Sequence, residues 1–311
     1  MKQILVLGIS GGLGGEVAKA FLEEGWQIVA LHRNPAEARK RFDPAAPIKW
    51  IKGDALVEKD VIEAANDCSH IFHGVNPPRY RNWRELALPM LKNSIAAAHA
   101  HSARLIFPGN VYNYDPRTNS LITEETAQNP ISKKGQVRCE MEELVQRAVC
   151  PTLIVRAGDF FGSFAPASWF QTVMIPSGSK SKAVTSPEFE GVGHAWAYLP
   201  DLAKTILELV NKENDLQRHD VFNFGGHYLE PGQSMATEIQ KQLGRDFKIK
   251  KAPWRLIGLL SFFVPLFREI KEMKYLWEVP LKLDNSKLVA FLGQEPHTDL
   301  PSAVRRSLPD F

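Results

Sequence analysis

The sequence opens with an apolar run that stops at a cluster of glycines: Gln3-Ile4-Leu5-Val6-Leu7-Gly8-Ile9-Ser10-Gly11-Gly12-Leu13-Gly14-Gly15. The apolar run is typical of a buried strand, and the residues after the glycines predict a helix. Free amides at a helix N-terminus bind anions, and glycine lets the backbone come close to a phosphate. We therefore expect a pyrophosphate-binding turn, with a purely structural tight turn as the alternative. Its predicted binding residues are Gly8, Ser10, Gly11, Gly12, Leu13 and Gly14.

Short apolar runs with helical stretches between them continue along the chain. The runs lie at residues 27–32, 48–51, 70–73, 104–107 and 152–156, and the helical stretches at 15–25, 83–101 and 136–149. Nearly continuous apolarity is what strands buried on both faces of a parallel sheet require. The rhythm predicts an α/β fold of the Rossmann type, a doubly wound parallel sheet with a smaller C-terminal α/β region.

The character of the sequence changes after Arg156, because residues 160–193 are rich in Gly, Pro and Ser and have no steady period. We expect residues 1–158 to bind NAD(P), with 195–225 returning to that domain through a helix at 202–211 and a strand at 220–224. Residues 159–194 and 226–311 would then bind the substrate. The apolar run at 256–267 is shorter than the roughly twenty residues that span a bilayer. It predicts a buried helix, with contact to a membrane surface or a partner as the alternative.

Composition excludes several classes of function. The chain has 311 residues, 44% apolar and 23% charged, and a formal charge of +3, which describes a soluble globular protein. Its charges are dispersed, so neither a nucleic-acid partner nor a membrane partner is expected. Cys68, Cys139 and Cys150 show no metal-binding spacing, and the nine histidines form no HxxxH or HxH pattern, so we expect no metal site. An odd number of cysteines fits a reducing cytoplasm.

The glycines follow a GxxGxxG spacing, and further landmarks follow in order: Gly53-Asp54, Val111-Tyr112, Arg156-Ala157-Gly158-Asp159-Phe160-Phe161-Gly162 and Trp196-Ala197-Tyr198-Leu199-Pro200-Asp201-Leu202-Ala203. With these motifs the chain resembles the extended short-chain dehydrogenase/reductase superfamily, specifically its NAD(P)-dependent epimerase/dehydratase-like members. The resemblance implies a nicotinamide cofactor and an oxidoreductase or epimerase/dehydratase reaction on a small carbonyl or sugar-like substrate. It also implies a homodimer formed through the helices at 83–101 and 136–149.

The end of the second strand predicts the choice of dinucleotide. An acidic residue there would bind the adenosine ribose, but this chain has His32 and Arg33. Arg33 can make charge-assisted contacts with a 2′-phosphate and His32 can add a donor, so we expect NADP(H) rather than NAD(H). A solvated arginine is the alternative. The resemblance places the remaining cofactor contacts at Asp54, beside the adenine, and at Ala55, Gly74, Val75, Asn76, Pro108, Lys134 and Ala157.

The catalytic positions depart from the family pattern. Pro108 stands at the usual Ser or Thr position, Lys134 at that of the tyrosine, and Arg138 at that of the lysine. If the protein is an enzyme, Lys134 could donate the proton, because a neighbouring Arg138 would make it release its proton more readily, and Arg138 would hold the ribose. Tyr112 and Tyr114 are other candidate donors, although the family usually has a structural tyrosine where Tyr112 stands. The competing hypothesis is a non-catalytic NADP(H)-binding redox sensor or regulatory protein.

Three other features have simpler interpretations. His194 precedes Ala195-Trp196 and is expected to pack, with a position in the substrate cleft as the alternative. Asp201 follows Pro200, which suggests an N-cap for the next helix. The aromatic residues Trp169-Phe170 and Tyr275 to Trp277 are expected to form core, with one face possible as the wall of a pocket.

Overall fold

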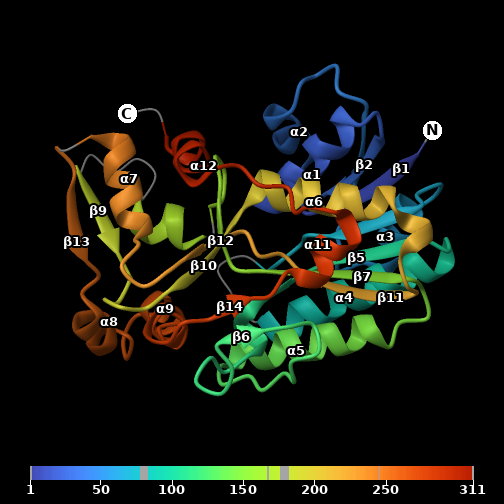
Figure 1. Ribbon diagram of the computed structural model, residues 1–311. Helices are drawn as coiled ribbons and strands as arrows, with labels where there is room; N and C mark the ends of the chain where they lie inside the picture. Colours follow the sequence, from blue (N-terminus) through green and yellow to red (C-terminus); the bar gives the residue numbers. More distant parts are fainter. Residues whose placement is uncertain (1, 78–82, 167, 176–181, 245, 310–311) are drawn as a thin grey trace.

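The structure is a computed structural model that describes residues 2–77, 83–166, 168–175, 182–244 and 246–309. Its centre is a seven-stranded sheet with the order β11-β7-β5-β4-β1-β2-β3, and every pairing in it is parallel. The predicted doubly wound α/β fold is therefore confirmed (Figure 1). The strands are β1 Gln3–Leu7, β2 Gln27–His32, β3 Ile48–Lys52, β4 His70–His73, β5 Arg104–Asn110, β7 Thr152–Ala157 and β11 His219–Asn223.

Helices cover both faces of this sheet. One face packs against α1 and α6, and the other against α3, α4 and α5 (Figure 1). The bounds of the helices in this half are α1 Gly12–Glu23, α2 Pro35–Ala38, η1 Arg39–Arg41, α3 Glu58–Ala64, α4 Trp83–Ala100, η3 Val111–Asn113, α5 Lys133–Gln146, α6 Leu199–Asn211 and η5 Glu213–Asp215. Parallel strands need long crossover connections, and the helix in each crossover carries the chain back to the end of the sheet where the next strand begins.

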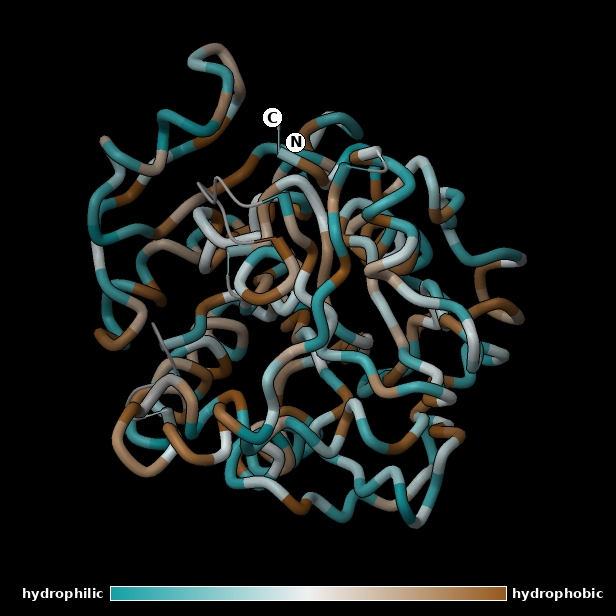
Figure 2. The backbone as a smooth tube through the Cα atoms, turned by 90° about the vertical axis from the view of Figure 1, so that its left-hand side faces the viewer, coloured by the Kyte–Doolittle hydropathy of each residue, from teal (hydrophilic) through white to brown (hydrophobic). Residues whose placement is uncertain are grey.

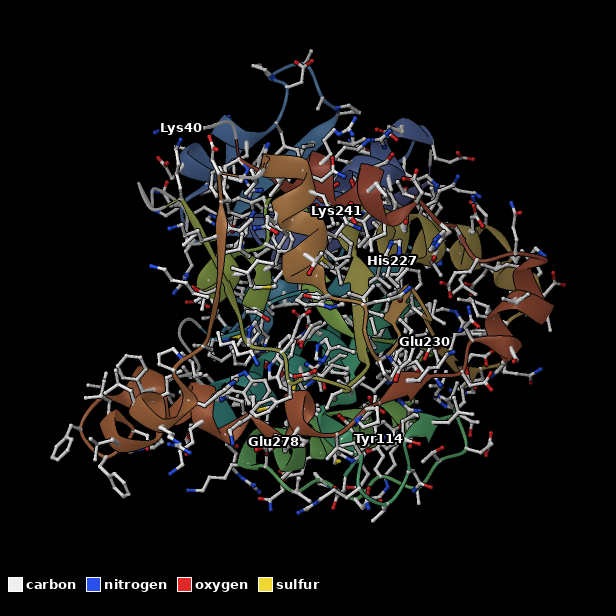
Figure 3. The ribbon with its side chains drawn as sticks, turned by 60° about the vertical axis from the view of Figure 1, so that its left-hand side comes forward. Lys40, Tyr114, His227, Glu230, Lys241 and Glu278 are labelled. Atoms are coloured by element: carbon white, nitrogen blue, oxygen red, sulfur yellow. The ribbon has the colours of Figure 1, made fainter. Side chains whose placement is uncertain are left out.

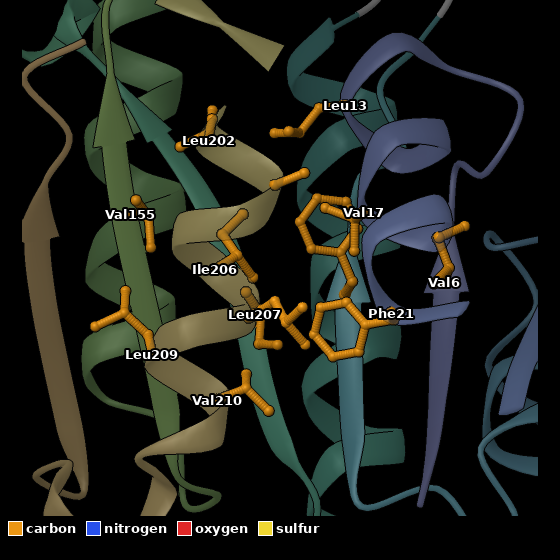
Figure 4. Close-up of a cluster of buried hydrophobic side chains, with 14 of the residues drawn as sticks. Val6, Leu13, Val17, Phe21, Val155, Leu202, Ile206, Leu207, Leu209 and Val210 are labelled. Atoms are coloured by element: carbon orange, nitrogen blue, oxygen red, sulfur yellow. The ribbon is translucent and has the colours of Figure 1, made fainter. Parts of the chain in front are cut away.

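The main core lies between the sheet and the pair α1 and α6. Val17 and Phe21 of α1 are completely buried and belong to the same cluster as Ile206 of α6 and Val6 of β1 (Figure 4). These apolar positions recur every three or four residues along each helix, so one stripe faces the sheet. The packing fixes the N-terminus of α1 at the carboxyl end of β1, where the glycine cluster lies.

The C-terminal part of the chain lies beside the carboxyl edge of the central sheet (Figure 1). It holds a three-stranded sheet, β12-β10-β8, and a two-stranded sheet, β13-β9, while β14 pairs with β6. Hydrophobic residues occur in short stretches throughout the molecule rather than in one block (Figure 2). The bounds are β6 Leu121–Ile122, β8 Asp159–Phe161, a π-helical turn Phe170–Met174, β9 Ala183–Ser186, β10 His194–Tyr198, β12 His227–Leu229, α7 Met235–Leu243, β13 Lys248–Lys251, α8 Trp254–Leu260, α9 Pro265–Glu272, α10 Tyr275–Glu278, β14 Lys282–Leu283, α11 Ser286–Leu292 and α12 Leu300–Ser307.

Residues 199–223 lie against the N-terminal half: α6 packs on α1, and β11 pairs with β7 at the edge of the sheet. The expected N-cap at Asp201 is wrong, because α6 begins at Leu199 and its N-cap residue is Tyr198. Asp201 lies in the first turn instead. Its carboxylate accepts hydrogen bonds from the Thr298 amide at 2.7 Å and the Thr298 hydroxyl at 2.8 Å. Asp201 therefore ties the C-terminal segment to α6.

The expected buried helix at residues 256–267 is also wrong. This stretch forms the end of α8, a turn and the start of α9, and Leu256, Leu259, Phe262 and Phe263 on it are exposed. Ile257 and Ser261 are the buried positions. An apolar run without a clear period does not say which side of a short helix the protein covers. Among the described residues, no helix is long and apolar enough to cross a membrane.

Candidate functional site

The glycine turn between β1 and α1 has the geometry of an anion-binding helix terminus. The Gly11 amide donates to the Gly8 carbonyl at 2.8 Å, and the Gly15 amide donates to the Gly11 carbonyl at 3.1 Å. The amides of Gly12, Leu13 and Gly14 belong to the first turn of α1, where a helix has no earlier carbonyl to bind. These amides form the positive end of the helix dipole, and they lie at the carboxyl edge of the sheet.

Two of these glycines are required by close packing. Gly8 has φ of +87°, and a Cβ atom there would lie 2.4 Å from the Gly74 carbonyl oxygen. A Cβ atom on Gly14 would lie 2.3 Å from the Gly8 carbonyl oxygen. The turn is thus closely packed backbone with no room for a side chain at Gly8 or Gly14, which is the role that glycines have in dinucleotide-binding turns.

Arg41 and Phe164 lie at the mouth of the turn, and no motif in the sequence marks either residue as part of a site. The Arg41 guanidinium donates to the Ser10 carbonyl and lies 3.5 Å from the centre of the Phe164 ring. The Phe164 carbonyl oxygen lies 2.7 Å from where a Gly12 Cβ would be. Partial burial lowers the pKa of Arg41 from its ordinary value, although the group stays charged. A cation therefore stands where a phosphate would enter.

His32 supports this turn directly. Its Nδ1 accepts a hydrogen bond from the Asn34 amide at 3.0 Å, which leaves the ring proton on Nε2. Nε2 lies 3.1 Å from the Ser10 hydroxyl oxygen, so it can donate to that oxygen. Arg33 is exposed next to it at the end of β2. His32 and Arg33 thus lie on the side of the turn where the resemblance places the adenosine ribose.

The other expected adenosine contacts line the same edge. One Asp54 oxygen accepts the Leu56 amide at 3.0 Å, which is an ordinary turn interaction, and the Ala55 carbonyl accepts the Asn93 side-chain amide at 2.9 Å. The Gly74 amide donates to the Leu7 carbonyl at 2.8 Å and so holds Val75 beside the turn. Asn76 accepts a hydrogen bond from the Trp83 indole.

Pro108 and Arg138 contact each other. The Arg138 guanidinium donates to the Pro108 carbonyl and lies 4.9 Å from the centre of the Phe107 ring. Pro108 pairs with Val155 in the sheet, and Ala157 ends the neighbouring strand β7. The structure therefore brings Pro108, Arg138 and Ala157 together at one end of adjacent strands.

Lys134 is buried at the start of α5, where its ammonium meets two carboxylates of α9. Its Nζ lies 2.6 Å from Glu269 Oε2 and 3.5 Å from Glu272 Oε2, and it donates to the Glu269 carbonyl at 3.1 Å. The Lys134 amide also donates to Glu272 at 3.0 Å. We expected Arg138 to be the main charged neighbour of the Lys134 ammonium. In the structure the ammonium instead contacts the carboxylates of Glu269 and Glu272, which have the opposite charge.

The two tyrosines near this position differ. Tyr112 is half-buried, its amide donates to the Asn110 side chain at 2.9 Å, and it packs on the cluster around Val111 and Leu276. Tyr114 is completely buried, and burial raises the pKa of its hydroxyl. Tyr114 is therefore a poor proton donor, and of these two tyrosines Tyr112 is the remaining candidate.

A buried histidine lies beside these groups. His194 Nε2 lies 2.8 Å from Asp159 Oδ2, its Nδ1 lies 3.2 Å from the Leu276 carbonyl, and the ring stacks on Trp277 at 3.8 Å between centres. Both partners are acceptors, so both bonds form together only when the ring carries two protons. His194 thus packs as expected, and its ring also contacts the buried carboxylate of Asp159, a partner with no signal in the local sequence.

The described cavities lie beside these groups rather than at the glycine turn. The larger has a volume of about 260 Å³ and apolar walls that include Trp169, Trp254, Ile257, Phe267 and Ile270. The smaller, of about 10 Å³, lies between Val111, Asp159 and His194. Among the described residues, no group of His, Cys, Asp and Glu could hold a metal ion. The three cysteines are free, and burial raises the pKa of Cys68 and of Cys139 to about 12.

Comparison with known families gives a match over residues 1–252 with the family described as the RmlD substrate binding domain. The chain belongs to this family. No curated protein sequence matches it. Together with the fold, membership of the RmlD substrate binding domain family places the chain in the extended short-chain dehydrogenase/reductase superfamily, as the motifs predicted.

Solved structures share the fold of this RmlD-family chain over nearly its whole length. UDP-glucuronic acid 4-epimerase from Bacillus cereus, in complex with UDP-glucuronic acid and NAD, is 16% identical with a TM-score of 0.76, covering 98% of this chain and 97% of that one. WbmH from Bordetella bronchiseptica, in complex with NAD+, is 15% identical with a TM-score of 0.74, covering 99% and 97%. UDP-glucose 4-epimerase from Bifidobacterium longum, in complex with NAD+ and UDP, is 14% identical with a TM-score of 0.74, covering 98% and 97%.

Proposed function

We propose that the protein is an NAD(P)-dependent oxidoreductase or epimerase/dehydratase-type enzyme that acts on a small carbonyl or sugar-like substrate. The observation that carries this proposal is the glycine turn at the N-terminus of α1, here called the glycine cradle, where Gly8 and Gly14 leave no room for a side chain and the first amides of α1 have no helical partner. Membership of the RmlD substrate binding domain family supports it. One similar structure holds NAD with UDP-glucuronic acid and another holds NAD+ with UDP, which makes a sugar nucleotide the first substrate to test.

We infer a preference for NADP(H). Arg33 at the end of β2 and Arg41 at the mouth of the turn supply two cations on the adenosine side, where a 2′-phosphate adds negative charge. Charge-assisted hydrogen bonds to a phosphate are the stronger kind, and Arg favours them by its planar fork of donors. The similar structures that carry NAD do not support this finer choice, so it rests on Arg33 and Arg41.

The proposed roles of Arg138 and Lys134 follow from the groups that each of them contacts. Arg138, fixed by the Pro108 carbonyl, would hold the nicotinamide ribose. Lys134 would hold or donate the proton at the substrate oxygen, with Glu269 and Glu272 keeping its ammonium charged and positioned. A bound nicotinamide supplies the hydride transfer itself. Tyr112 is the second candidate proton donor.

A non-catalytic NADP(H)-binding sensor is the second candidate function, and one observation favours it. The Lys134 ammonium is paired with α9 and the Arg138 guanidinium with a carbonyl, so both groups at the usual catalytic positions have structural partners. Such a protein needs only the glycine cradle and its cations. It would bind the cofactor and change conformation with its redox state.

Binding and turnover measurements test the proposal. NADPH and NADH should each be titrated calorimetrically into the wild type and into Gly11→Ala, whose Cβ would lie 3.1 Å from the Gly8 carbonyl oxygen in the turn. We expect Gly11→Ala to weaken binding about tenfold or more, and Gly258→Ala, which meets nothing within 4 Å, to leave it unchanged. If the wild type bound neither NADPH nor NADH, the whole proposal would be refuted.

A second experiment distinguishes the enzyme hypothesis from the sensor hypothesis. The protein is incubated with reduced or oxidised cofactor and with aldehydes, ketones, quinones and UDP-sugars, and both cofactor absorbance and sugar products are followed. Turnover of any substrate supports the enzyme. Tight cofactor binding with no turnover across the panel supports the sensor.

We also propose a homodimer and a cytoplasmic location. The dimer would form through α4 and α5, which lie side by side and are joined by an Arg84 to Glu140 ion pair at 2.7 Å. Free thiols at Cys68, Cys139 and Cys150 fit a reducing compartment. Sedimentation of the full chain as a monomer would contradict the dimer.

A further inference from the structure

The α8–α9 hairpin carries exposed apolar side chains on a fixed scaffold. We call Leu256, Leu259, Phe262, Phe263 and Val264 the apolar edge. Phe263 is 79% exposed, Phe262 71% and Leu259 62%. Figure 3 shows α8 and α9 projecting at the lower left, away from the central sheet. Five exposed aromatic and aliphatic residues within nine positions differ from the singly scattered hydrophobic residues of an ordinary surface and indicate an interaction surface.

The inner side of the hairpin is anchored, so the apolar edge is held outward. The Trp254 indole donates to the Pro187 carbonyl at 3.1 Å, and its ring lies against Trp169 and Phe189. Ile257 is buried, and the Ser261 hydroxyl donates to the Gly258 carbonyl at 2.7 Å. A surface already held in its binding conformation loses little entropy when it binds.

Cations accompany the apolar edge. Residues 247–271 contain six basic residues, Lys248, Lys250, Lys251, Arg255, Arg268 and Lys271, and a single acidic one, Glu269. Glu269 and the next carboxylate, Glu272, contact the buried Lys134. Lys271 lies 5.2 Å from the centre of the Phe262 ring, so cation and aromatic group are in contact on this surface. The hairpin itself thus carries Arg255, Arg268 and Lys271, the preceding strand β13 adds three lysines, and the two hairpin carboxylates are paired with Lys134.

We propose that the α8–α9 hairpin docks on the surface of an anionic lipid bilayer. Aromatic and leucine side chains flanked by Lys and Arg are the combination that enters the interface between acyl chains and anionic headgroups. A second copy of the chain is a poorer occupant, because two positively charged edges facing each other repel. The proposal concerns peripheral binding and is independent of the cofactor and of the reaction.

Co-sedimentation of the full chain with vesicles tests this inference. One set of vesicles contains phosphatidylglycerol and phosphatidylcholine, and the other contains phosphatidylcholine alone. We expect binding to the anionic vesicles that weakens as salt is added, and little binding to the neutral ones. Phe262→Ser combined with Phe263→Ser should weaken binding about tenfold or more, and Arg255→Glu combined with Lys271→Glu should do the same.

Matched controls keep the experiment specific. Val149→Ser removes a side chain that is 62% exposed, as Leu259 is, but follows α5 on another part of the molecule, and Lys204→Glu reverses an exposed charge on α6. Neither should change vesicle binding, and circular dichroism with thermal melting should show that every variant is folded. The hairpin variants concern exposed side chains, so their melting temperatures should stay near that of the wild type.

Three results would overturn the proposal: no sedimentation of the wild type with anionic vesicles, equal binding to neutral vesicles, or equal losses in the control variants. A fourth result would also overturn it: the wild type associates with itself without lipid, does not bind vesicles, and loses this self-association when Phe262→Ser and Phe263→Ser are combined. The occupant of the apolar edge would then be a second copy of the chain. Protection of residues 254–264 from hydrogen exchange on anionic vesicles alone would support the proposal.

Discussion

The Nζ atom of Lys134 lies 2.6 Å from Oε2 of Glu269, so an ion pair with a buried lysine joins the first turn of α5 to α9. The resemblance places Lys134 where the superfamily has its tyrosine, and Glu269 comes from the C-terminal region. The proposed reacting end and the C-terminal region are therefore held together by charge. Any role of Lys134 in proton transfer depends on this partner.

Replacing Lys134 tests its proposed role. If Lys134 donates the proton, Lys134→Met should lower kcat about 100-fold or more while the cofactor Kd changes little. The control is Lys133→Met, since Lys133 is the adjacent but exposed residue of α5. Rates would be measured on whichever substrate the panel identifies, alongside melting temperature, because Glu269 and Glu272 lose their cation. Parent-like turnover in folded Lys134→Met would remove Lys134 from the mechanism.

The preference for NADP(H) is expected to depend on Arg33 and Arg41. Removing either cation should reduce the ratio of NADPH to NADH affinity about tenfold, since a hydrogen bond to a charged group contributes about 1.5–3 kcal/mol. Arg41→Ala should also weaken NADH, because Arg41 lies at the pyrophosphate turn. Lys40→Ala is the control, because Lys40 is exposed and pairs with Glu37. Equal affinity of the wild type for both nucleotides would contradict this prediction.

The buried pair of Arg156 and Glu142 is expected to be essential for folding. Glu142 is 1% exposed and accepts hydrogen bonds from Arg156 at 2.8 Å and from Gln128 at 2.7 Å. Glu142→Gln leaves the guanidinium buried without its counter-charge and should lower the free energy of unfolding by about 3–5 kcal/mol. Glu143→Gln, at an exposed pair with Arg147, should change it by about 0.5 kcal/mol or less. Urea denaturation of both variants gives the comparison.

Buried His227 predicts a loss of stability in acid. Burial, and next the nearby His297, lower the pKa of His227 from 6.5 to about 4. Between these values the unfolded chain binds a proton that the folded chain does not, so the free energy of unfolding falls as the pH falls, by about 2–3 kcal/mol for this group. His227→Phe should make that fall shallower. His99→Gln, an exposed position, should not.

Melting curves across this pH range measure the effect. His73 remains in both proteins, and burial lowers its pKa to about 3, so part of the acid destabilisation persists in His227→Phe. Identical pH profiles for the wild type and His227→Phe would show that His227 does not contribute.

Local sequence was sufficient for the central sheet and the glycine turn. Gln3–Leu7 and Gln27–His32 are strands as expected, because their apolar runs are bounded by glycine and polar residues nearby in the sequence. The partners of Lys134 were not predictable in this way. Glu269 is 135 positions away, and its helix has no motif that marks it as a neighbour of α5.

Asp201 and residues 256–267 both show that local sequence does not predict contacts with distant residues. Asp201 follows Pro200 as an N-cap residue often does, yet a contact with Thr298 holds its carboxylate instead. In the 256–267 stretch, apolar composition indicated burial, but composition does not say whether another element covers the outer side. Both errors concern contacts with distant parts of the chain, one that is made at Asp201 and one that is absent at the outer side of residues 256–267.

The ion pair between Lys134 and Glu269 also has a consequence for biosynthesis. During translation residues 1–158 emerge first, and Lys134 gains its contacts with Glu269 and Glu272 only after the ribosome has added more than 130 further residues. The nascent chain can thus form most of its central sheet before α5 is joined to α9. Ribosome-stalled chains that stop before residue 269 should therefore bind nucleotide poorly or be recognised by chaperones.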